Sequence, residues 1–443
     1  MDNRLAQDFN AYGLIKFTLP STIMLVFMSL YQMVDGVFVS NIVGENALSA
    51  LNIVYPIPSI IIAVSIMLST GGSAIIAKNM GERKPQEAKE NFSLIVLAGA
   101  IFAFAFQLFG LLFLGPLIRM LGATEALYDY CCNYLGIFLL TCPLSVMQML
   151  FQNFFVTAGK PHWGLIWTIV GGCVNVLFDY VFVAVMGLGV SGAAIATAMG
   201  YAIPAIVGLL YFSLNRKGTL YFVRPKFRGK VLLFTCANGS SEMVNNIAVA
   251  ITTFLFNVLM LKYAGEAGVA AITVVLYAQF LMTSVFMGFS SGVAPVISFN
   301  FGKQNHPQLK KIFKICLWVI GVVSLLVFAL AELGSSLIIR VFAGPETDVF
   351  ALAKHGFTLF SLSFLVTGVN IFASAMFTAF SDGLVSAIIS FLRTFVFLLV
   401  CLLALPLALG LDGIWLAVPV AEGLAVAVSI YYLVRRRKRY CYA

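Results

Sequence analysis

Two carboxylates lie inside stretches of the sequence that are otherwise long and apolar. Asp35 lies within residues 17–51, and Asp179 lies in VNVLFDYVFV (174–183). If these stretches cross a membrane, a charge near the centre of each helix costs roughly 2.5 to 3.5 kcal/mol on insertion scales. Such a group normally has an interior partner or a water-filled cavity. We therefore expect both carboxylates to have a role in function.

Polar residues accompany the two carboxylates at helical spacing. Tyr31 precedes Asp35 by four residues, so this pair shares one face of a helix. Asn175 precedes Asp179 by the same interval. At a rise of about 1.5 Å per residue, Asp35, Asp179 and Thr197 each lie about 10 Å from the outer end of their stretch. The five side chains could form one network that binds a proton, with a titration that belongs to the coupled carboxylates.

Two further features bear on the same chemistry. Pro20 interrupts the stretch that contains Asp35 and removes a backbone donor, so we expect a kink or hinge there. The segment TCANGSSEMVNN (235–246) is unusually polar for its depth. Its residues Asn238 and Glu242 share a helix face and could line a central cavity or supply one ligand of a sodium site. A solvated helix entrance near the cytoplasm is the competing interpretation.

Three other charged residues fall within or near apolar stretches. Glu332 is close enough to a helix end to reach water, whereas Glu422 is deep and no partner is evident from the sequence. Arg393 could extend its long side chain to the cytoplasmic interface or bind a lipid headgroup, and we favour the interface.

Motifs for cofactors and metals are not recognisable. GLGVSG (187–192) matches G-x-G-x-x-G, but it joins two apolar stretches and no strand precedes it. A phosphate-binding G-x-x-x-x-G-K-[ST] loop does not occur. His162, His306 and His355 are far apart, without zinc spacing. We expect no cofactor and no metal site, which leaves an ion gradient as the energy source.

The composition requires a membrane protein. Of the 443 residues, 61% are hydrophobic and 10% are charged, whereas about 25% of a soluble domain is charged. The apolar runs are long enough to cross about 30 Å of hydrocarbon and do not alternate as in a membrane barrel. We expect an all-α polytopic protein with twelve spans, at 12–41, 47–77, 91–117, 128–157, 163–186, 190–214, 232–262, 268–300, 312–337, 350–379, 384–408 and 411–434.

The basic residues predict the orientation of these spans. The net charge is +9, but most Lys and Arg residues fall in the segments that share a side with the N-terminus, including the run 435–439. By the positive-inside rule, both termini lie in the cytoplasm. The positive charge therefore indicates topology in the cytoplasmic membrane and no nucleic-acid partner.

The chain contains an internal repeat. At one offset of 221 residues, Gly71 matches Gly292, Asn79 matches Asn300, and Thr157 matches Thr378. Because six spans separate equivalent positions, the two halves have the same membrane orientation. We expect an N-terminal six-helix lobe at 1–215, a basic cytoplasmic linker at 216–230, and a C-terminal lobe at 231–443.

The sequence resembles a multidrug and toxic compound extrusion (MATE) transporter over essentially its whole length. The resemblance lies in Pro20 and Asp35, and in GENALSAL (44–51), NMGERKPQEAK (79–89), VNVLFDYVFV (174–183), GLGVSGAAIATA (187–198) and SGVAPVISFNFGKQNHPQLKK (291–311). It implies the two-lobed MATE fold and an antiporter that expels organic compounds by exchange with protons or sodium.

The closest resemblance is to the proton-coupled branch of DNA-damage-inducible type. It implies that Tyr31, Asp35, Asn175, Asp179 and Thr197 couple protons to substrate. It also implies a polar residue on the fourth span, for which Gln152 and Asn153 are candidates.

We expect a monomer, not an enzyme, that exports bulky amphiphilic and often cationic compounds. Sodium coupling and a lipid-linked precursor flippase are the alternatives of related architecture. A membrane-embedded enzyme is the rival from another class.

Overall fold

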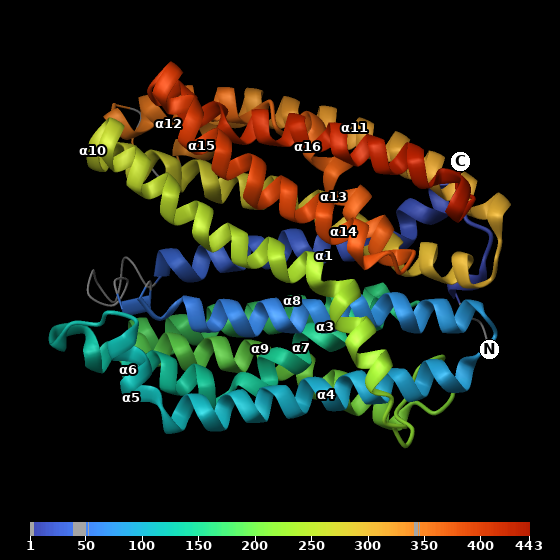
Figure 1. The fold of residues 1–443 in the computed structure, drawn as a ribbon. Coiled ribbons are helices and arrows are strands. Elements are labelled where there is room, and N and C mark those ends of the chain that lie inside the picture. The colour runs from blue at the N-terminus through green and yellow to red at the C-terminus, as the bar shows by residue number, and fades with distance from the viewer. Residues whose placement is uncertain (1–3, 39–49, 52, 341–343, 345) are drawn as a thin grey trace. The chain divides into compact units, whose positions relative to one another are not determined.

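The computed structural model describes residues 4–38, 50–51, 53–340, 344 and 346–443. The side chains of Gln32 and of residues 34–38 lie outside this description. Within the described ranges, every regular element is a helix, as the sequence predicts (Figure 1).

The first half of the chain begins with a short 3₁₀ turn at Arg4–Ala6 and a long first helix. The helices that follow are joined by short loops, and a π-helical segment, η3, extends one of them. The elements are α1 (Ala11–Phe38), α3 (Pro56–Gly81), α4 (Pro85–Leu112), α5 (Leu114–Met120), α6 (Glu125–Leu140), α7 (Cys142–Thr157), α8 (Pro161–Asp179), η3 (Tyr180–Val185) and α9 (Gly189–Leu214).

The second half begins with a helix of 74 residues that bends sharply at Gly265, whose φ is 64°. Glycine tolerates this positive φ because it has no Cβ atom. A second π-helical segment, η4, interrupts a later helix. The elements are α10 (Gly229–Gly302), α11 (His306–Arg340), α12 (Asp348–Ser361), α13 (Phe364–Ala379), α14 (Gly383–Phe391), η4 (Leu392–Phe397), α15 (Leu398–Leu409) and α16 (Leu411–Tyr440).

The predicted number of spans agrees with these helices. In the described residues, nine helices are long and apolar enough to cross a membrane. The pairs α6 with α7 and α12 with α13 are bent by 52° and 54°, and counting each as one broken span gives eleven. Dividing α10 at Gly265 gives twelve, the number expected from the hydrophobic pattern.

The chain forms two compact units. Unit 1 contains residues 1–7 and 23–239, and unit 2 contains residues 8–22 and 240–443. These units differ from the expected lobes in two places. The first part of α1 belongs to unit 2, and the first part of α10 belongs to unit 1.

Each unit has its own hydrophobic core. In unit 1 the core is rich in phenylalanine, and the ring of Phe92 lies 4.9 Å from that of Phe212 and 5.2 Å from that of Phe154. In unit 2, Trp415 is fully buried at the centre of the core. Many large apolar side chains are exposed instead, such as Leu333 and Leu407, which is the surface that a lipid bilayer requires.

The basic linker between the halves is attached to the start of α4. Lys226 Nζ lies 2.8 Å from Glu90 Oε1, and Arg228 Nη2 lies 3.3 Å from Glu90 Oε2. Lys89 Nζ donates a hydrogen bond of 2.9 Å to the hydroxyl of Tyr221, and this hydrogen bond lowers the pKa of Tyr221. The linker is therefore held against the start of α4 by contacts that involve charged side chains.

Candidate functional site

The site in unit 1 is positioned by the close crossing of α8 and α9. A Cβ atom added to Gly171 would lie 2.5 Å from the carbonyl oxygen of Gly200. One added to Gly200 would lie 2.9 Å from the Cβ atom of Asn175. Because both contacts are shorter than side chains permit, the two glycines allow the backbones to approach, as small residues do in membrane helices.

Helix α1 contacts the same region of α8. A Cβ atom added to Gly172 would lie 2.6 Å from the ring of Phe27 and 3.1 Å from the ring of Tyr31. The absence of a side chain at Gly172 therefore lets Tyr31 lie against α8.

A small cavity lies among α1, α7, α8 and α9. Its volume is about 10 Å³, which is about the space that one water molecule needs. Tyr31, Asn175 and Thr197, which the sequence analysis placed in one network, all line it. The structure therefore brings three of the five predicted coupling residues to one place, although their role stays a prediction.

Each of the two carboxylate residues lies on its helix one turn after a residue that lines this cavity. Asp179 is 1% exposed and ends α8 one helical turn after Asn175. The backbone of Asp35 lies in α1 one turn after Tyr31, and its side chain lies outside the described residues. One turn corresponds to about 5.4 Å along the axis. A buried carboxylate beside a polar cavity can exchange a proton if water reaches it.

Gln148 is a lining residue that the sequence analysis missed. It lies on α7 and is 2% exposed, and its Oε1 atom has no hydrogen-bond partner among the described residues. The Oδ1 atom of Asn175 is also without a described partner. Buried acceptors are normally satisfied, so these two oxygens could bind a water molecule or a donor group. The signal in the sequence is the interval of one helical turn from Gln148 to Gln152.

The two candidates on the fourth span face different neighbours. Gln152 Nε2 donates to Met28 Sδ at 2.8 Å and to Thr168 Oγ1 at 3.4 Å. Thr168 lines the cavity, so Gln152 supports the cavity wall. Asn153 Nδ2 instead donates to Ser69 Oγ of α3 at 3.0 Å.

The polar start of α10 is also packed within the protein. Asn238 is 1% exposed. Glu242 accepts a hydrogen bond of 3.4 Å from Asn245 Nδ2, and the charge of Arg393 acts on the Glu242 carboxylate.

Pro20 lies inside α1, two residues before the last residue of this helix that belongs to unit 2.

Two expectations about the second half are wrong. Arg393 does not extend to the interface, and Glu422 does have a partner. Arg393 Nε donates to Glu422 Oε1 at 2.8 Å, and the side chains are 13% and 7% exposed. The physical reason is that pairing two buried charges avoids the cost of leaving either alone. Glu332 also has a partner, because Ser361 Oγ donates to its Oε1 atom.

The described His, Cys, Asp and Glu residues do not gather into a group of three or more that could hold a metal ion.

Twelve apolar spans, two repeated halves and a polar cavity beside a buried carboxylate define an integral membrane transporter. The MatE family model matches residues 20–181 and 243–403, with one match in each half. The chain belongs to this family of MATE transporters and is not an enzyme.

Comparisons with individual proteins agree with this assignment. The chain is 22% identical over 432 residues to the multidrug export protein MepA of Staphylococcus saprophyticus, covering 96% of this chain and 94% of MepA. A crystal structure of a MATE protein in complex with MaL6 superposes with a TM-score of 0.92 at 20% identity, covering 99% of both chains. The outward-facing conformation of a multidrug resistance MATE transporter of the MOP superfamily gives 0.91 at 20% identity and the same coverage. These structures show the MATE fold.

Proposed function

We propose that the protein is a secondary-active exporter of bulky amphiphilic, often cationic compounds in exchange for protons. Membership of the MATE family supports the transporter class, and the name of MepA, a multidrug export protein, supports the substrate class. The observation that carries proton exchange is the buried Asp179, one turn from a cavity that Tyr31, Asn175 and Thr197 line.

The coupling follows from the cost of a buried charge. When Asp179 and Asp35 are ionised, each needs water, donors or a cationic ligand nearby. A cationic substrate supplies such a partner, whereas a proton removes the need for one. Protonation from outside would therefore release the substrate, and loss of the proton to the cytoplasm would restore the binding state. Pro20, near the change of unit in α1, is the proposed hinge for this alternation.

The protein acts in the cytoplasmic membrane as a monomer, with both termini in the cytoplasm. Most Lys and Arg residues fall in segments on the same side of the membrane as the N-terminus, which supports this orientation.

Transport by purified protein in vesicles tests the proposal. Export of a fluorescent organic cation is measured under an imposed pH gradient and then under a sodium gradient. We expect transport driven by pH in the wild type and its loss in Asp35→Asn and in Asp179→Asn. Asp129→Asn is the matched control, because Asp129 is exposed on α6.

Other outcomes would replace the proposal. Transport driven by sodium alone would assign the coupling to sodium, with Glu242 as the next carboxylate to change. Movement of a lipid-linked anion, with no dye export under either gradient, would make the protein a flippase.

A further inference from the structure

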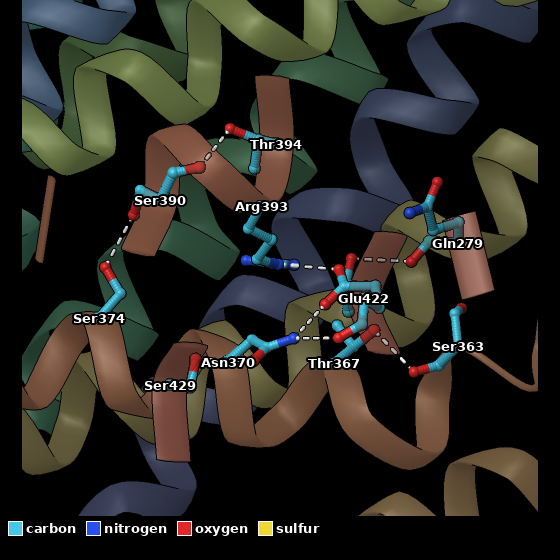
Figure 2. Close-up of polar contacts among 11 residues, drawn as sticks. Gln279, Ser363, Thr367, Asn370, Ser374, Ser390, Arg393, Thr394, Glu422 and Ser429 are labelled. Carbon is cyan, nitrogen blue, oxygen red and sulfur yellow. Dashed lines mark hydrogen bonds and ion pairs between the residues drawn. The ribbon is translucent and has the colours of Figure 1, made fainter. Parts of the chain in front are cut away.

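A buried network in unit 2 connects α13, η4 and α16. The carboxylate of Glu422 accepts one hydrogen bond at each oxygen, from Arg393 Nε at 2.8 Å and from Asn370 Nδ2 at 2.6 Å. Asn370 Nδ2 also donates to the backbone carbonyl of Glu422 at 3.0 Å, and Ser429 Oγ donates to Asn370 Oδ1 at 2.8 Å. Figure 2 shows Arg393 and Asn370 approaching Glu422 from different helices. Glu422 is therefore fixed by partners on both sides.

The guanidinium of Arg393 is only partly used in this network. It has five N–H donors, and Nε alone makes a hydrogen bond to a described residue. The two terminal nitrogens have no hydrogen-bond acceptor among the described residues, while 13% of the side chain is exposed. The planar fork of a guanidinium matches a carboxylate or phosphate with two parallel hydrogen bonds.

The internal repeat places this network at the counterpart of the cavity in unit 1. At the offset of 221 residues, Arg393 corresponds to Gly172 and Glu422 corresponds to Tyr201. Gly172 and Tyr201 both line the cavity of unit 1. The second half therefore carries an ion pair at the positions where the first half leaves space for a small polar cavity.

The local backbone sets Arg393 apart in a further way. It lies in η4, a π-helical segment at Leu392–Phe397 that interrupts the span between α14 and α15. Such segments insert an extra residue into a turn and often occur at functional sites.

The geometry points to Arg393 as a ligand-binding residue for an oxyanion group, a carboxylate or a phosphate, carried by an amphiphilic compound. Its terminal nitrogens bind the oxyanion, and Glu422 and Asn370 hold the guanidinium in position. The inference rests on the proposed export of amphiphiles and adds a recognition element for their acidic group. Glu242 also acts electrostatically on Arg393, and its ionised form would oppose an anionic ligand.

Binding of two matched dyes tests this role. One is a xanthylium dye with a free carboxylate, and the other is the methyl ester of the same dye. Binding to purified full-length protein in nanodiscs is followed by fluorescence anisotropy. We expect the wild type to bind the acid more tightly than the ester. Arg393→Gln should weaken binding of the acid about ten- to a hundredfold, the value of hydrogen bonds to a charged group, and leave the ester within about twofold.

Further variants separate binding from folding. Because Arg393→Gln leaves Glu422 buried without its cation, the double variant Arg393→Gln/Glu422→Gln removes both charges and should show the same selective loss. Arg393→Lys keeps the positive charge but not the planar guanidinium, so its affinity for the acid should lie between those of the wild type and Arg393→Gln. Glu242→Gln should tighten binding of the acid. Arg340→Gln, at an exposed position at the end of α11, is the matched control and should change neither affinity.

Equal affinity of the wild type for acid and ester would overturn the inference, as would an equal loss of both in the double variant. Export of the ester under a pH gradient, with no preference for the acid in binding, would leave the proposed function intact and reject this inference alone. Tighter binding of the acid without export of either dye would support this inference and reject the proposed function.

Discussion

The Cβ atom of Asn175 lies 2.9 Å from the position that a Cβ atom of Gly200 would occupy. This distance fixes the crossing of α8 and α9 and, with it, one wall of the cavity that Asn175 lines. The cavity therefore depends on a glycine that itself carries no functional group.

The first prediction concerns this crossing. Gly200→Ala should lower the free energy of unfolding by about 1–3 kcal/mol, the usual cost of overpacking, and should reduce transport by displacing Asn175. Thermal unfolding in detergent measures the first effect. Gly321→Ala on α11 is the control, because nothing lies within 4 Å of the added atom. Equal melting temperatures for the two variants would contradict the prediction.

The second prediction concerns Gln148. Replacing it by Leu removes an unsatisfied acceptor from the cavity while keeping an apolar body of similar size. We expect the protein to remain folded and the apparent affinity for the exported dye to fall about tenfold, because Leu cannot accept the one or two hydrogen bonds that a donor entering the cavity would make to Gln148. Gln7→Leu, at an exposed position, should leave the apparent KM unchanged. Unchanged transport in Gln148→Leu would show that the cavity is outside the route.

The third prediction concerns the hinge. Pro20→Ala restores a backbone donor within α1 and removes the ring that opposes a straight helix. We expect turnover to fall several-fold while equilibrium binding of the dye stays within about twofold, because the change affects movement and not the ligand contacts. Parallel transport and binding assays distinguish the two quantities. A loss of binding with normal turnover would exclude a hinge at this position.

The fourth prediction concerns the linker. Glu90 contacts both Lys226 and Arg228, so Glu90→Gln should release this part of the linker. Trypsin should then cut the detergent-solubilised protein after Lys226, Arg228 and Lys230 several-fold faster. High salt should produce part of the same effect in the wild type, since it screens exposed charges. The control variant Glu125→Gln, at an exposed position on α6, should be cut by trypsin at the wild-type rate.

The fold, and the meeting of three polar side chains at one cavity, could be predicted because their signals are local or periodic. Apolar length defines the spans, and the single offset defines the repeat. The four-residue spacing put Tyr31 and Asn175 on the same helix faces as their carboxylates, and the distance to the outer helix ends indicated a shared depth for the carboxylates and Thr197. Tyr31, Asn175 and Thr197 do line one cavity.

The rest depended on helix rotation, which one sequence does not encode directly. Gln148 and Gln152 share a face of α7, but only the structure shows which of them reaches the cavity. Arg393 and Glu422 lie on different helices, and their pairing follows from the rotation of η4 against α16. A long side chain such as that of Arg393 can reach several environments, so composition alone favoured the wrong one.

The first part of α1 belongs to unit 2 and the first part of α10 belongs to unit 1. This assignment also constrains the order in which the chain can fold during synthesis. Residues 8–22 are made before the other residues of unit 2 and pack against one made much later: a Cβ atom on Gly292 would lie 3.2 Å from the Cα atom of Thr18. Unit 1 likewise needs residues up to 239. The start of the first helix therefore lacks its partners until most of the protein has been translated, and incompletely packed segments of this kind are where chaperones act during synthesis.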